Sequence, residues 1–292
     1  MARISAAQLA PLPVTRSNID VLDFLSLSGC ALQVNLGRRN SSLGRTASAS
    51  QRLLLDLEFL DLVPDCITQL RATDDEALAE QLSIMAQTRR NELPASIYNA
   101  ILAGPEFQQF WQIPAALSDY PKRTNSQIAD TLLRLDALTA HWLAGNYRTD
   151  NHEFERLLAE MRAGDGGSLM RAASTQTFML AQADAMLAAA NSGAPLCAQA
   201  VVSPQVEIIR NVVGRFFAED VQRWLADIAK RRHLLMPPIT ALEARLNAVL
   251  PPQYRDWQSE RDAQLTQIGD ASRRHVSAIQ QLLRDCPGMP SA

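Results

Sequence analysis

The sequence predicts an all-α fold, an elongated multi-helix bundle with long antiparallel helices. The 292 residues include 43 Ala and 40 Leu but only 12 Gly. Ala and Leu favour helices, whereas strands favour β-branched and aromatic residues. No segment alternates apolar and polar residues over the length of a half-buried strand. Hydrophobic residues make up 47% of the chain and charged residues 20%, as is typical of folded globular proteins.

Each expected helix has apolar residues at three- and four-residue spacing and capping or breaking residues at its ends. Because proline cannot donate a backbone hydrogen bond, we expect Pro64, Pro94, Pro237 and Pro251 to lie at helix boundaries. The expected helices cover residues 17–37, 50–63, 73–90, 94–103, 126–144, 151–163, 168–190, 206–228, 239–250 and 254–285.

The strongest pattern lies in residues 206–228, where apolar side chains including Val213 and Phe216 follow a heptad rhythm. This rhythm predicts a helix in a bundle interface. We expect residues 1–16 to form an extended N-terminal arm and residues 17–292 to form a single all-helical domain. Two subhalves of that domain would meet near 145–167, where the glycines of residues 164–167 predict a hinge between helices.

Charge and motif content argue against several classes of function. The net charge is −3 at pH 7, so the chain lacks the basic character of nucleic-acid-binding proteins and we expect no nucleic-acid partner. The sequence contains no GxSxG serine elbow, no HExxH zinc motif and no phosphate-binding P-loop. We therefore expect no catalytic residue, no cofactor and no metal ion.

One polar segment, residues 38–52, is a candidate ligand site and is called the polar corner below. Its arginines, together with free amides at the start of the next helix, could hold a carboxylate or phosphate. The alternative, which the sequence favours, is that Arg39, Asn40 and Arg45 are taken up by hydrogen bonds to neighbouring helix ends. The ligand-binding candidates are Arg39, Asn40, Ser41, Ser42, Arg45, Gln51, Arg52 and Glu106.

Four cysteines leave two interpretations open. They are either buried free thiols or two disulfides, for which three pairings exist. Pairing Cys30 with Cys66 and Cys197 with Cys286 keeps each bridge within one half of the chain, with Cα separations of about 5 to 6 Å if the bonds form. Bridges would indicate an oxidising compartment, and four free thiols would indicate the cytoplasm.

The N-terminal residues favour a different compartment from the one that disulfides would indicate. Residues 1–15 lack the charged, apolar and small-residue order of a secretory signal, which by itself predicts a cytoplasmic chain. The longest uncharged run, 185–206, contains Asn191, Pro195 and Pro204, so we expect a helix end followed by a loop and not a membrane span.

Two sequence blocks carry a family resemblance. The first spans residues 21–67, with Leu22-Asp23-Phe24-Leu25, Arg39-Asn40-Ser41-Ser42-Leu43-Gly44-Arg45 and Cys66-Ile67. The second contains Leu93-Pro94-Ala95-Ser96-Ile97-Tyr98-Asn99 and Gly104-Pro105-Glu106-Phe107. In these blocks the chain resembles an uncharacterised family of Gram-negative envelope lipoproteins, the domain of unknown function 3080.

The resemblance implies a location but no chemistry. Members of that family usually begin with a lipoprotein signal and a lipidated cysteine, so it implies a periplasmic or outer-membrane lipoprotein that contacts the membrane only through a lipid anchor. The sequence as given shows neither feature upstream of the first block. The family has no assigned activity, so no catalytic residue is carried over.

Three hypotheses for the function follow. The leading one is a non-catalytic, periplasm-facing envelope protein that binds an unidentified partner or ligand. The second is an envelope enzyme that uses a carboxylate such as Glu106 beside Arg39 and Asn40. The third is a cytoplasmic helical interaction protein with reduced thiols. If the Arg and Ser side chains of the polar corner face a cavity, the segment is a ligand site. If they face the protein's own backbone, they only hold the connection between two helices.

Overall fold

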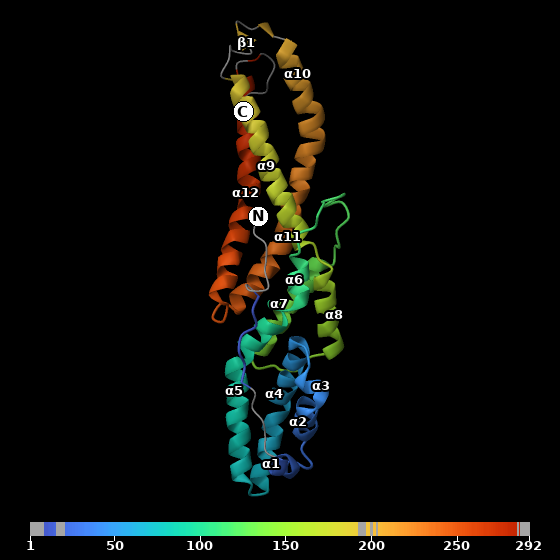
Figure 1. The fold of residues 1–292 in the computed structure, drawn as a ribbon, viewed down its shortest axis with the longest axis vertical. Helices are drawn as coiled ribbons and strands as arrows, with labels where there is room; N and C mark the ends of the chain where they lie inside the picture. The colour runs from blue at the N-terminus through green and yellow to red at the C-terminus, as the bar shows by residue number, and fades with distance from the viewer. Residues whose placement is uncertain are drawn as a thin grey trace.

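The computed structural model describes residues 9–15, 21–191, 197–198, 201–202, 204–284 and 286. It shows an elongated all-α protein in which long helices are stacked end to end and side by side (Figure 1). The predicted fold class is confirmed. Within these residues the only strands are β1 (Cys197–Ala198) and β2 (Val201–Val202), a two-residue antiparallel pair at one tip.

The end of the molecule that carries the candidate site is built from the first five helices. These are α1 (Val21–Ser26), α2 (Leu32–Asn40), α3 (Ser42–Arg45), α4 (Ala49–Ala72) and α5 (Glu76–Ala100). A three-residue turn joins α4 to α5, so the two run antiparallel and bury a shared leucine-rich face. The helix α2 packs on the other side of α4, and the extended segment 9–15 inserts Leu9 into the same core.

The middle of the molecule contains α6 (Pro105–Phe110), α7 (Ile128–Leu143) and α8 (Asn151–Arg162). An aromatic cluster joins this region to its neighbours on both sides. Phe107 and Trp111 contact Trp257, and Tyr98 contacts Tyr254 edge to face with ring centroids 5.9 Å apart. One continuous core therefore extends from the α4–α5 pair to the start of the last helix.

The opposite end consists of α9 (Gly166–Asn191), α10 (Pro204–Val212), the π-helix η1 (Val213–Val221), α11 (Gln222–Arg245) and α12 (Pro252–Leu283). The helices α9 and α12 run in the same direction, because Met170, Gln176 and Asp184 contact successively later residues of α12. The helix α11 returns antiparallel to both, as Figure 1 shows.

Several expected helix boundaries are wrong because proline lies inside helices. Pro64 lies within α4, Pro94 within α5, and Pro237 and Pro238 within α11. A proline in a helix interior costs about 3 kcal/mol. Apolar residues continue at helical spacing beyond each proline, as Cys66 and Leu70 do in α4, so packing against neighbouring helices outweighs this cost.

The first expected helix, 17–37, is divided instead into α1 and α2, with residues 16–20 outside the described residues. Gly29 adopts a φ of +93°, a left-handed conformation that ends a helix and that glycine adopts without strain. Cys30 therefore lies in a turn and not on a helix. Cys66 lies within α4 and not beyond its end.

The heptad prediction for 206–228 is correct for Val206 and Ile228, which are buried, but wrong for Phe216, which is 61% exposed. The segment passes through η1, where each hydrogen-bonded turn contains one more residue than in an α-helix. The extra residue rotates the side chains, and Phe217 packs against the core clusters in place of Phe216.

The glycine-rich hinge predicted at 164–167 is a point of close packing between helices. A Cβ on Gly167 would overlap the carbonyl group of Gln112, and a Cβ on Gly166 would overlap the Phe110 ring. Only glycine therefore allows the start of α9 to approach the end of α6. The neighbouring Asp165 pairs with buried Arg231 of α11, which fixes this junction further.

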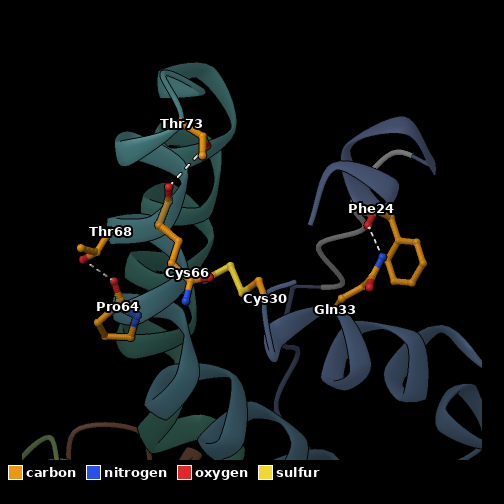
Figure 2. Close-up of a disulfide and its surroundings, with 8 residues drawn as sticks. Phe24, Cys30, Gln33, Pro64, Cys66, Thr68 and Thr73 are labelled. Atoms are coloured by element: carbon orange, nitrogen blue, oxygen red, sulfur yellow. Dashed lines mark hydrogen bonds between the residues drawn. A yellow bond between two sulfur atoms is a disulfide. The ribbon is translucent and has the colours of Figure 1, made fainter. Parts of the chain in front are cut away.

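The cysteines form the two local disulfides, Cys30–Cys66 and Cys197–Cys286, with Cα separations of 5.6 and 5.1 Å. Figure 2 shows Cys30 in the turn before α2, reaching Cys66 on α4, with Gln33 donating a hydrogen bond to the Phe24 carbonyl nearby. The second bond joins β1 to Cys286, which follows the end of α12. Paired disulfides indicate an oxidising compartment and not the reducing cytoplasm.

Two structural features are missing from the described residues. Among them, no helix combines the length and apolarity needed to cross a membrane. Nowhere in the same part of the chain do three or more His, Cys, Asp or Glu side chains gather as they would around a metal ion.

Candidate functional site

A cavity of about 730 Å³ opens beside the polar corner. One wall is the extended segment Pro11–Thr15, called the strap below. The end of α2, the helix α3, the first turns of α4 and the last turns of α5 supply the other lining residues. The lining residues are Pro11, Leu12, Pro13, Val14, Thr15, Arg39, Asn40, Gly44, Arg45, Ala49, Arg52, Leu53, Asp56, Ser96 and Asn99.

The strap is held on α5 through its backbone. The Leu12 N–H donates to Asn99 Oδ1 at 2.7 Å, and Asn99 Nδ2 donates to the Leu12 carbonyl at 2.9 Å. Two turns earlier on α5, Glu92 accepts hydrogen bonds from the Thr15 N–H and hydroxyl. Proline on both sides of Leu12 favours an extended backbone. The strap therefore binds to α5 as an extended segment.

The floor of the cavity covers a cluster of buried charges. Asp56 of α4 forms an ion pair with Arg39 of α2, and its Oδ1 lies 3.8 Å from Nε of Arg89 on α5. The Arg89 side chain is 5% exposed and lies 3.5 Å above the centre of the Phe59 ring. None of its three guanidinium nitrogens has a hydrogen-bond partner among the described residues. A half-buried guanidinium group, that of Arg39, and a buried one, that of Arg89, thus share one carboxylate.

Glu92 of α5 is a second negative charge acting on this cluster, and the pKa shifts are caused first by burial. Burial, and next the charge of Arg39, lower the pKa of Arg89 to about 10. Burial raises the pKa of Asp56 above its ordinary value, although Arg39 and Arg89 act in the opposite direction. Both charged forms are therefore costly in this environment, and an added negative charge would stabilise the two arginines.

Two further arginines lie on the rim of the cavity. Arg52 donates from Nη2 to the Arg45 carbonyl at 3.2 Å, which orients its side chain across the corner. Within the part of the chain that the structure describes, the side chains of Asn40 and Arg45 make no hydrogen bond. Gly44 allows the tight approach here, because a Cβ at this position would overlap the carbonyl oxygens of Arg38 and Arg39.

The expectation that Arg39, Asn40 and Arg45 are occupied by helix ends is wrong. Arg39 pairs with a carboxylate, and all three side chains line the open cavity. The physical reason is that shorter side chains already cap the helices. Ser41 Oγ accepts from Gly44 N–H and donates to the Arg38 carbonyl at the end of α2, and Thr46 Oγ1 donates to the Ser42 and Leu43 carbonyls of α3. These helix-end carbonyls therefore have donors already, and the arginines are available for other contacts.

The other predicted site residues lie outside the cavity. Ser41 is the cap just described, Ser42 is the exposed first residue of α3, and Gln51 contributes its backbone N–H to a cap. Glu106 lies in a separate hollow of about 570 Å³ with Arg162, Trp111 and three glutamines. The structure therefore does not bring Glu106 together with Arg39 and Asn40, as the hypothesis of an enzyme requires.

Sequence reasoning missed half of the site. Asp56, Arg89 and Asn99 lie on helices whose apolar pattern predicted core packing, and the strap was treated only as an arm. One signal was available, because Asp56 and Arg89 stand among apolar residues on helix faces that bury leucine. A charged residue on such a face requires a partner, but the sequence did not say which one.

A family model described as a protein of unknown function, DUF3080, matches residues 4–290. The chain belongs to the DUF3080 family. No curated protein and no solved structure matches it. The matched range includes the strap, the polar corner and both disulfides, so every part of the candidate site lies within the DUF3080 region.

Proposed function

We propose that this DUF3080 protein is a non-catalytic, periplasm-facing protein of the cell envelope that binds an anionic ligand in the cavity beside the strap. The observation that carries the proposal is the charge of the site. Arg39 and buried Arg89 share Asp56, and Arg45 and Arg52 add two more guanidinium groups on the rim. The chain as a whole has a net charge of −3, so the positive charge is local.

Guanidinium groups around a hollow favour carboxylate and phosphate ligands. Their N–H groups form paired hydrogen bonds to two oxygens of one anion, and such charge-assisted bonds are stronger than neutral ones. The start of α4 faces the same space, since Ala49 lines the cavity, and helix N-termini also favour anions. Asn40 and Ser96 supply further polar groups on the wall.

Two observations support the envelope location. Both disulfides suit an oxidising compartment, and the sequence blocks at 21–67 and 93–111 resemble envelope lipoproteins. The same disulfides count against the cytoplasmic alternative. The enzyme alternative loses its motivation because Glu106 and Arg39 lie in different hollows.

Replacing both rim arginines tests the proposal. Titration calorimetry with inorganic phosphate and with acetate should show binding to the native protein that weakens as salt is added. In the double variant R45Q/R52Q we expect at least a tenfold loss of affinity, because a hydrogen bond to a charged group contributes about 1.5–3 kcal/mol. The matched control is R274Q, an exposed arginine on α12 away from the cavity, which should bind like the native protein. Equal binding by all three proteins, or none by the native one, would refute the proposal.

Binding of sulfate should strengthen as pH falls, because Asp56 competes with the ligand for Arg39. The groups facing Asp56 are Arg39 on α2 and Arg89 and Glu92 on α5. The pKa of Asp56 is raised by burial, so lowering the pH from neutrality towards 3.8, the ordinary aspartate value, neutralises its charge while sulfate stays a dianion. We expect D56N to bind sulfate about three- to tenfold more tightly at neutral pH and to lose most of the pH dependence. Weaker binding by folded D56N would contradict the competition.

A further inference from the structure

We infer that the ligand is an organic anion with an apolar body, and not an inorganic anion. This inference rests on the proposed function and names the class of molecule that the same cavity takes. It follows from the residues that line the cavity, because the arginines and most of the apolar side chains come from different segments. The arginines lie on the α2–α4 side, and the strap supplies Pro11, Leu12, Pro13 and Val14.

The hydrogen bonds that hold the strap involve its backbone and Thr15, and not its apolar side chains. Asn99 and Glu92 bind the backbone of the strap and the hydroxyl of Thr15, which leaves the Leu12 and Val14 side chains to define the surface. Along this extended segment Leu12 and Val14 are half-buried, whereas Pro11, Pro13 and Thr15 are exposed. This alternation places Leu12 and Val14 on the inner side of the strap. Buried Leu53 of α4 adds to the apolar surface.

The size of the cavity also exceeds what a small ion requires. A volume of about 730 Å³ lies within the range of about 300–1,000 Å³ found for sites that bind organic molecules. Such sites combine an apolar lining with a few polar groups that fix orientation. An anionic head at Arg45 and Arg52 would leave the rest of the molecule against Leu12, Val14 and Leu53. Alkyl phosphates and fatty carboxylates share this chemistry.

The test is an alkyl-chain series with two head groups. Calorimetry on the full chain would compare inorganic phosphate with butyl, hexyl and octyl phosphate, and acetate with butanoate, hexanoate and octanoate, all below their micelle concentrations. A fully buried methylene contributes about 0.8 kcal/mol, which corresponds to about fourfold in affinity. We expect a gain of about two- to fourfold for each added methylene in at least one series. The series with the larger gain identifies phosphate or carboxylate as the head group. Octanol, which has no charge, should not bind measurably.

Two variants locate the apolar body. In V14S the gain for each methylene should fall while the affinity for inorganic phosphate stays the same, because only the strap wall has changed. The matched control V34S alters a valine on α2 that is 65% exposed and outside the cavity, and should leave both quantities unchanged. Circular dichroism melting confirms that each variant is folded.

The outcomes separate the two proposals. If inorganic phosphate or acetate binds and longer chains bring no gain, the apolar-body inference is wrong and the anion-binding function stands. If no anion binds, both are wrong. Octanol binding as tightly as octyl phosphate would also overturn both, because the cavity would then recognise apolar surface alone. A chain-length gain that V14S leaves intact would overturn the assignment of the body to the strap wall.

Discussion

Replacing Glu243 by alanine is expected to lower the free energy of unfolding by about 3–5 kcal/mol, the cost of breaking a buried ion pair. Glu243 of α11 is 1% exposed and holds Arg261 of α12, which is fully buried, through bonds of 2.6 and 2.9 Å. It also accepts from Tyr254 and Gln258. Its removal leaves the half-exposed carboxylate of Asp262 as the ion-pair partner of the Arg261 guanidinium, which lies about 5 Å from the Trp111 and Trp257 rings.

The charge of Arg261 persists in this setting. Burial lowers the pKa of Arg261, but its hydrogen bonds to Glu243 and the charge of Glu243 outweigh burial and raise it above its ordinary value. A second variant, E243L/R261M, removes both charges and should recover most of the lost stability. The control D136A breaks the partly exposed pair with Arg245 and should cost less than about 1 kcal/mol. Denaturant unfolding measures all three, and a loss for E243A no larger than that for D136A would contradict the prediction.

The double variant C197S/C286S should lose about 4–5 kcal/mol of unfolding free energy, because the native bond closes a loop with a sequence separation of 89 residues. The hydrophobic cluster around this bond is small and includes Val206, Ile279 and Leu283. The end of α9 is also held to α12 by Leu187, which packs against this cluster, and by the hydrogen bond between Asp184 and His275. We expect amide exchange in α10 and the last turns of α12 to quicken, while the α4–α5 pair keeps its protection.

The other disulfide supplies the comparison. Cys30–Cys66 closes a shorter loop, with a separation of 36 residues, so C30S/C66S should lose about 4 kcal/mol in the chain-entropy model. Its effect should be confined to α1, α2 and the neighbouring part of α4. Guanidinium unfolding of both double variants provides the measurement. The prediction is that the Cys197–Cys286 bond stabilises mainly the end of the molecule that carries β1 and β2. It is wrong if C197S/C286S unfolds at the native midpoint, or if amide exchange quickens equally throughout the molecule.

The local pairing of the cysteines was predictable because each pair flanks helices that neighbour each other. The precise positions were not. Cys66 lies inside α4 because helix continues through Pro64, and Cys30 lies in a turn because Gly29 has a positive φ. Both outcomes depend on packing energies of several kcal/mol that local propensity does not contain. Phe216 shows the same limit, since η1 shifted the heptad phase.

The candidate site could be predicted only where it is contiguous in sequence. Arg39, Asn40, Arg45 and Arg52 stand within one segment, and their density identified the polar corner. Asp56 and Arg89 could not be assigned from sequence, because each is a single charged residue on a helix with an apolar pattern. Asn99 receives the strap across a separation of 87 residues, which no local pattern contains.

The amino-acid sequence was sufficient to predict the all-helical fold, the heptad segment as a helix, the pairing of cysteines that we expected if they are bonded, and the polar corner. These follow from composition, periodicity and spacing, which act over a few turns of chain. The packing of the helices was needed to show that Arg39 and Arg89 share Asp56, that Arg39, Asn40 and Arg45 line a cavity, and that the strap supplies apolar residues to it. The physical reason is that buried charge and cavity shape arise from contacts between elements far apart in sequence, and their energies depend on desolvation, which exists only once the helices are packed.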